Sequence, residues 1–134
     1  MNRKLNFRIG IAMALGAFML VGTGIGGEVR AASEKMSFAE DVMPIFQGRC
    51  VSCHRPGAEG YDKSGFDLTT YAGLMKGTKF GPMIIPGQPE TSNIMVLLDW
   101  RASPELRMPH GKKKLSTCDR DAIRAWIREG ANNN

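Results

Sequence analysis

The feature that most constrains this 134-residue chain is the segment Cys50-Val51-Ser52-Cys53-His54, which has the pattern C-x-x-C-H. Two thiols one helical turn apart can each add across one vinyl group of the same porphyrin, and the following histidine can place an imidazole nitrogen at the iron. This is the spacing of a c-type haem attachment site, and imidazole is a common axial ligand of haem iron. The motif therefore predicts one covalently bound haem c.

Two other interpretations of the cysteine pair are weaker. A thioredoxin-like redox pair is expected next to a βαβ pattern, and a zinc site needs further ligands at zinc spacing. The chain has three cysteines and two histidines, and three of these five residues lie in the motif. Neither a βαβ pattern nor a second set of ligands is visible, so we favour haem c.

The first 32 residues differ from the rest of the chain. Arg3, Lys4 and Arg8 form a basic segment, residues 9–25 are apolar and rich in Gly and Ala, and small residues at 31–32 suit cleavage. This pattern is typical of a secretory signal peptide, and the length of the apolar run leaves an uncleaved membrane anchor as the alternative. We therefore expect residues 1–32 to be a signal peptide or anchor and residues 33–134 to be a monohaem domain.

The formal net charge of +5 overstates how basic that domain is. Removal of the N-terminal segment takes away four basic residues and one acidic residue, which leaves about +2. This balance does not indicate nucleic-acid binding. A domain of about a hundred residues buries a modest core, to which a haem adds apolar surface, so we expect the apo chain to be poorly folded.

The pattern of apolar residues predicts an all-α domain of three to four helices with long loops around the haem. Ser37 and Glu40 fit a capping box at the start of the first helix. Pro44 either kinks this helix or begins a shorter one near Met43. The motif follows directly, so the haem site is expected where the first helix ends.

Further helices are predicted after the motif. Residues 68–75 and 94–98 have helical spacing. The last helix is the clearest, because Ile123, Trp126 and Ile127 share one apolar face. The segments between helices are irregular or rich in Gly and Pro and are expected to be loops; they are residues 55–65, 79–89 and 101–114, and residues 131–134 are expected to be a frayed tail.

A six-coordinate haem needs a second axial ligand from the protein. The candidates outside the N-terminal segment are His110 and the methionines Met36, Met43, Met75, Met83, Met95 and Met108. The first two methionines precede the motif, and Met75 and Met95 lie on apolar helical faces, where methionine usually belongs to the core. We favour Met108, because Pro109 stiffens its loop just before the last helix.

Three further segments accompany the motif: residues 81–92, the pair Met108-Pro109, and residues 126–131. Together they resemble class I cytochrome c and, more closely, the planctomycete-type cytochrome c domain, over about residues 38–131. The resemblance implies that Cys50 and Cys53 bind the haem and that His54 and Met108 ligate its iron. Many relatives have Met-Pro-Pro where this chain has Met108-Pro109-His110, so His110 is the alternative ligand.

The resemblance also implies a function. We expect an electron-transfer protein rather than an enzyme, located in the periplasm, because haem c is assembled on the outer side of the bacterial inner membrane. Ligation by Met108 favours ferrous iron and predicts a positive reduction potential. An open or weakly held sixth position would instead suit a haem-based enzyme or gas sensor. An uncleaved N-terminal segment would suit a membrane-tethered subunit of a larger oxidoreductase.

Charged and reactive side chains near Met108 suggest a surface for partners. Lys112, Lys113 and Lys114 follow it closely and would steer an acidic redox partner to the haem edge; the alternative is a solvated loop with scattered charge. Cys118 has no partner left within the chain. We interpret it as a small buried residue, with an intermolecular disulfide or a reactive thiol as the alternatives.

Overall fold

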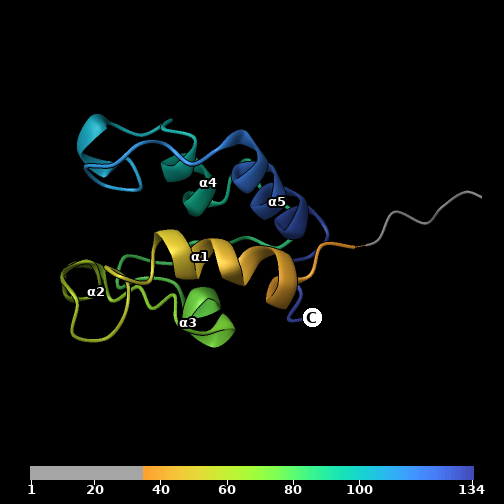
Figure 1. The fold of residues 1–134 in the computed structure, drawn as a ribbon, viewed down its shortest axis with the longest axis horizontal. Coiled ribbons are helices and arrows are strands. Elements are labelled where there is room, and N and C mark those ends of the chain that lie inside the picture. Colours follow the sequence, from red (N-terminus) through yellow and green to blue (C-terminus); the bar gives the residue numbers. More distant parts are fainter. Residues whose placement is uncertain (1–34) are drawn as a thin grey trace, which may run out of the picture. The chain divides into compact units, whose positions relative to one another are not determined.

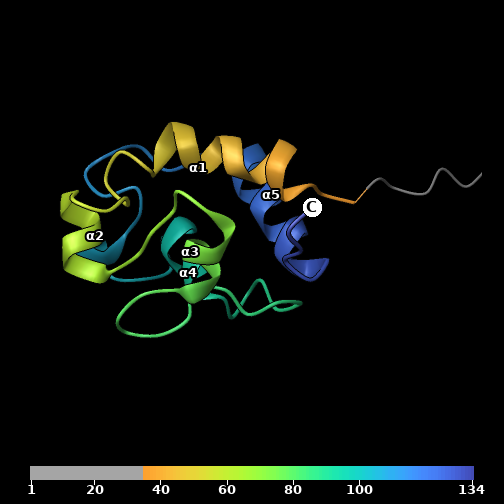
Figure 2. The same cartoon turned by 90° about the horizontal axis from the view of Figure 1, so that it is seen from below.

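The structure, a computed structural model, describes residues 35–134 (Figures 1 and 2). Its helical elements are η1 (Phe38–Val42, a π-helical turn), α1 (Met43–Arg49), α2 (Glu59–Ser64), α3 (Tyr71–Lys76), α4 (Asn93–Leu98), η2 (Pro104–Leu106, a 3₁₀ turn) and α5 (Thr117–Arg128). This part of the chain contains five α-helices and no strand, which confirms the all-α, cytochrome c-like class. The expected number of three to four helices was too low, because α2 forms in a segment that the sequence assigned to a loop.

The N-terminal prediction concerns other residues. The signal peptide or anchor expected at residues 1–32 lies outside the described residues. Among residues 35–134, no helix has the length and apolar character needed to cross a membrane.

The first helical segment begins at Ser37, as expected, although the capping box is completed differently. The Ser37 hydroxyl accepts a hydrogen bond from the Glu40 amide at 3.2 Å, while the Ser37 amide donates to the Asp41 carboxylate at 2.7 Å. The sequence had given that second role to Glu40. The π-helical turn explains the change, because its wider winding brings the carboxylate one residue later into reach. Helix α1 then starts at Met43 with Pro44 in its first turn, where the missing amide does no harm.

The core forms where α5 packs against η1 and α4 (Figure 1). Ile123, Trp126 and Ile127 are buried, so the predicted apolar face of the last helix is confirmed. The Trp126 ring lies 5.3 Å from the Phe38 ring and 6.4 Å from the Tyr71 ring. Burying each of these large side chains stabilises the fold by roughly 1.5–3 kcal/mol.

The prediction of a frayed C-terminal tail is wrong. The Asn134 backbone carbonyl accepts from the Ala39 amide at 2.9 Å, and the Asn134 side-chain oxygen accepts from the Phe38 amide at 2.9 Å. The Trp126 indole donates to the Asn132 carbonyl at 2.8 Å, and Ala131 is buried. The first amides of a helix have no partner within it, and the tail supplies acceptors for them.

Helix α2 lies in a segment that the sequence assigned to a loop. Its glycine and polar composition gives little intrinsic helix preference. A contact with the motif stabilises it instead: the Tyr61 amide donates to the Cys53 carbonyl at 3.0 Å. The helix ends at Gly65, whose φ of +70° is in the left-handed region that favours glycine.

Candidate haem site

The C-x-x-C-H motif forms a compact turn at the end of α1. The Cys50 amide continues the helix by donating to the Phe46 carbonyl at 2.8 Å. The Cys53 and His54 amides both donate to the Cys50 carbonyl at 3.0 Å. The backbone therefore holds the two cysteines and the histidine together on one turn, as the attachment of a single porphyrin requires.

Residues that follow the motif in the sequence form hydrogen bonds with its backbone. The Cys53 carbonyl accepts from the Tyr61 amide at 3.0 Å, and the His54 carbonyl accepts from the Leu68 amide at 2.9 Å. Gly60 makes this approach of α2 possible. A Cβ at position 60 would lie 2.7 Å from the Cys53 carbonyl oxygen and 3.1 Å from the His54 ring.

The motif opens onto a cavity of about 570 Å³, within the usual range for ligand sites. Cys50, Cys53, His54 and Met108 all line it, so the structure brings the four predicted site residues to one place. Helix α2, helix α4 and residues 105–112 supply other parts of the wall. The wall also contains a set of apolar side chains, which includes Phe46, Phe66, Leu68, Met83, Ile94, Leu97 and Leu98, and charged side chains such as Arg49 and Lys112.

The chemistry of this set fits a haem c. Two thiols, an imidazole and a thioether are the groups that attach and ligate such a cofactor, and the apolar walls suit a porphyrin face. His54 Nδ1 is buried without a hydrogen-bond partner. Burial lowers the pKa of His54 below its ordinary value, and the Phe66 backbone acts in the opposite direction. Burial therefore favours the neutral imidazole, which is the form that binds a metal.

The cysteine pair does not have the electrostatics of a thioredoxin-type site. Burial raises the pKa of the Cys50 thiol to about 11, although the positive charges of Arg49 and Lys112 oppose this shift. Redox-active cysteines need a lowered pKa instead. Nor do any three His, Cys, Asp or Glu side chains in residues 35–134 form a group able to hold a metal ion.

The cavity reduces the number of candidates for the distal ligand. Met83, Met108 and His110 line it. Met95 is fully buried in the core, and the other three methionines pack against that core without reaching the cavity; they are Met36, Met43 and Met75. The backbone of Met108 makes two hydrogen bonds: its amide donates to the Leu97 carbonyl at 3.2 Å, and its carbonyl accepts from the Trp100 indole at 2.9 Å. The Met83 carbonyl accepts from the Ile94 amide at 3.0 Å.

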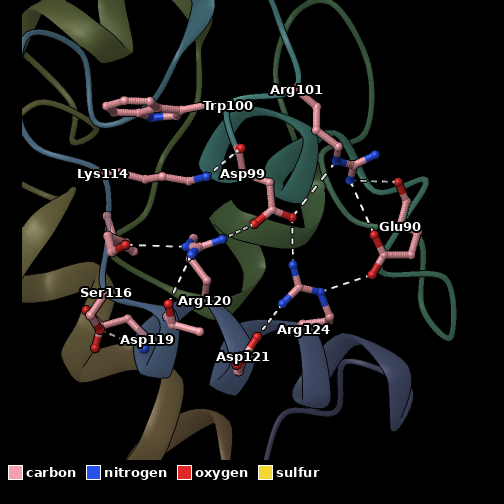
Figure 3. A network of polar contacts seen from close by, with 12 residues as sticks. Glu90, Asp99, Trp100, Arg101, Lys114, Ser116, Asp119, Arg120, Asp121 and Arg124 are labelled. Carbon is pink, nitrogen blue, oxygen red and sulfur yellow. Dashed lines mark hydrogen bonds and ion pairs between the residues drawn. The ribbon is translucent and has the colours of Figure 1, made fainter.

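Figure 3 shows a polar network centred on Asp99. It joins Asp99 to Lys114, and these two residues lie at the two ends of the loop that carries Met108. The Asp99 carboxylate accepts hydrogen bonds from Arg120 and Arg124, both at 2.6 Å, and the Asp99 carbonyl accepts from the Lys114 ammonium at 2.7 Å. Burial would raise the pKa of Asp99, but the hydrogen bonds and charges of the two arginines outweigh it and lower that pKa. The sequence gave no sign of this role, because the arginine partners lie on a helix more than 20 residues away.

The three lysines after Met108 have different surroundings. Lys112 is exposed and lines the cavity, and Lys113 is exposed. The Lys114 ammonium is engaged by the Asp99 carbonyl and lies 5.7 Å from the centre of the Trp100 ring. Cys118 is exposed, so its interpretation as a buried residue is wrong.

The helical fold and the cavity define a small cytochrome c-like domain. Residues 50–110 match the model of a family described as planctomycete cytochrome C, which confirms the resemblance over this segment. The match begins at the first cysteine of the motif and ends at His110, just after Met108-Pro109. No curated protein and no solved structure matches the chain.

Proposed function

We propose that this protein carries single electrons between redox partners through one haem c, attached to Cys50 and Cys53 and ligated by His54 and Met108. The observation that carries the proposal is that the motif and Met108, distant in sequence, line the same apolar cavity. When bound, the haem supplies reversible one-electron chemistry between ferric and ferrous iron.

The residues of the site have separate roles in this proposal. Cys50 and Cys53 would hold the haem covalently: each thiol would add its sulfur and its hydrogen across one vinyl group, which gives a thioether bond. The His54 imidazole and the Met108 thioether would ligate the iron. The apolar walls exclude water, and a thioether raises the reduction potential relative to a second imidazole.

A substitution at Met108 tests the distal ligand. In the ferric holoprotein, Met108→Ala should remove the long-wavelength sulfur-to-iron absorption band and lower the reduction potential, because the thioether is lost. Met83→Ala is the matched control: it removes a second methionine that lines the cavity and should keep the band. His110→Ala should also keep it.

Two results would contradict this assignment. If the band survives in Met108→Ala, Met108 is not the ligand, and loss of the band in Met83→Ala would identify Met83 instead. Rapid binding of carbon monoxide by the reduced wild-type protein would indicate an open sixth position and favour the gas-sensor or haem-enzyme alternative.

We also propose that residues 1–32 are a signal peptide and that residues 33–134 work in the periplasm. The basic segment, the apolar run and the small residues at the boundary support this. Mass spectrometry of the purified protein tests it: a mature N-terminus near residue 32 or 33 is expected. An intact N-terminal segment in the membrane fraction would instead support a tethered subunit of a larger oxidoreductase.

We propose that acidic redox partners dock beside the cavity at Lys112 and Lys113. Both side chains are exposed, and the former lines the cavity. The double variant Lys112→Glu/Lys113→Glu should slow electron transfer with an acidic partner at low salt and flatten its dependence on ionic strength. Lys76→Glu, an exposed change on α3 away from the cavity, is the control. Equal effects of the two changes would exclude a docking site here.

A further inference from the structure

We infer that Trp100 is a positioning residue for Met108: its indole N–H holds the Met108 carbonyl and so fixes where the thioether lies in the cavity. The inference rests on the proposed ligation by His54 and Met108. It assigns a role to a side chain that does not line the cavity itself.

The first observation is that the Met108 backbone is held from both sides. Its carbonyl accepts from the Trp100 indole at 2.9 Å, and its amide donates to the Leu97 carbonyl at 3.2 Å. Leu97 lies in the last turn of α4, and Trp100 lies two residues beyond its end. These two bonds hold Met108, whose side chain reaches the cavity. The bond to Leu97 is between backbone groups, so the bond from the Trp100 indole is the one that a side-chain substitution can remove.

The second observation is the backbone conformation of Trp100. Its φ is +62°, in the left-handed region that residues with a Cβ rarely adopt. The conformation has a local cause, a Schellman-type end of α4: the Trp100 amide donates to the Leu97 carbonyl at 3.2 Å, and the Arg101 amide donates to the Val96 carbonyl at 3.0 Å. Here it follows directly after α4, so it turns the chain sharply out of the helix and into the Met108 loop.

The third observation is that the surroundings of Trp100 are rigid. Arg107 and Lys114 lie 5.5 Å and 5.7 Å from the centre of its ring, within the range of cation–π contacts. Its neighbour Asp99 is fixed by Arg120 and Arg124 of α5 (Figure 3). Contacts therefore hold both the Trp100 ring and the neighbouring residue Asp99. With the indole held in place, its hydrogen bond can restrict the movement of Met108.

The experiment compares two tryptophans that make the same kind of hydrogen bond. Trp100→Phe removes the donor but keeps an aromatic ring. Trp126→Phe removes the indole bond to the Asn132 carbonyl, 2.8 Å long, in the core and away from the cavity. Added imidazole competes with the thioether for ferric iron, so its apparent affinity reports how firmly Met108 is held.

We expect Trp100→Phe to bind imidazole about three- to tenfold more tightly than wild type, since one hydrogen bond to the ligand segment is lost. The sulfur-to-iron band should weaken in parallel. Trp126→Phe should lower the denaturation midpoint but leave imidazole affinity within about twofold of wild type. Equal imidazole affinities of wild type and Trp100→Phe would overturn the inference, as would an equal effect of Trp126→Phe.

A measurement on the unaltered protein covers the case in which Trp100→Phe yields no holoprotein. Saturating imidazole should shift the indole N–H resonance of Trp100 and speed its hydrogen exchange, because coupling between sites is reciprocal, while the Trp126 resonance stays unchanged. An unmoved Trp100 resonance would overturn the inference. If wild type shows the sulfur-to-iron band while these tests fail, only the role of Trp100 is lost; if wild type lacks the band, the proposed ligation is lost with it.

Discussion

At the scale of single residues, Gly60 decides how closely α2 approaches the motif. A Cβ at this position would meet the Cys53 carbonyl at 2.7 Å, a distance that real Cβ contacts do not reach. The obstacle is backbone, so either α2 or the motif has to move. The geometry of the motif therefore depends on the absence of a side chain at position 60.

The change Gly60→Ala should destabilise the holoprotein by about 1–3 kcal/mol, as overpacking does. In a domain of this size the midpoint of thermal unfolding falls by about 4–8 °C for each kcal/mol. Gly48→Ala is the matched control, because its site is exposed on α1 with nothing within 4 Å of the new Cβ. It should be neutral or stabilising by up to about 1 kcal/mol. Equal midpoints for the two variants would show that α2 does not press on the motif.

At the scale of elements, the Asp99 network joins the end of α4 to α5 (Figure 3). Asp99→Asn should lower the free energy of unfolding at neutral pH by about 1–3 kcal/mol, because two arginines lose a charged acceptor. Chemical denaturation measures this change. Glu59→Gln, in an exposed pair with Lys63, should cause no measurable change.

The comparison of wild type with Asp99→Asn also predicts how the stability of the fold depends on pH. The pKa of Asp99 is lower in the folded protein than its ordinary value, so its ionised form stabilises the fold. This contribution is complete above the unfolded-state pKa of about 4 and is lost as the pH falls through the lower, folded-state value. The stability difference between wild type and Asp99→Asn should therefore shrink on acidification below about pH 4. A difference independent of pH would show that packing, rather than charge, explains the effect.

At the scale of the whole molecule, the cavity is a large apolar space within a domain of about a hundred residues. The double variant Cys50→Ala/Cys53→Ala cannot attach a haem covalently. We expect the purified variant to be colourless, to bind apolar dyes and to unfold at least about 10 °C below the holoprotein, because a bound group that stabilises only the folded state is missing. Cys118→Ala, at an exposed position, should keep both colour and stability. A colourless double variant as stable as the holoprotein would contradict this expectation.

The sequence alone determined the helical class, the start of the first helical segment and the identity of the candidate ligands. These follow from local rules: spacing fixes which residues share a helical face, and Ser37 caps the segment that follows it by accepting from the Glu40 amide. Only the tertiary structure decided that the C-terminal tail is ordered, that α2 forms and that Asp99 and Trp100 support Met108. The tail and Asp99 depend on hydrogen bonds between residues more than 20 positions apart. Helix α2 and Trp100 depend on bonds that span eight residues across a loop. Neither kind follows from helical spacing, so no local pattern in the sequence predicts the partner.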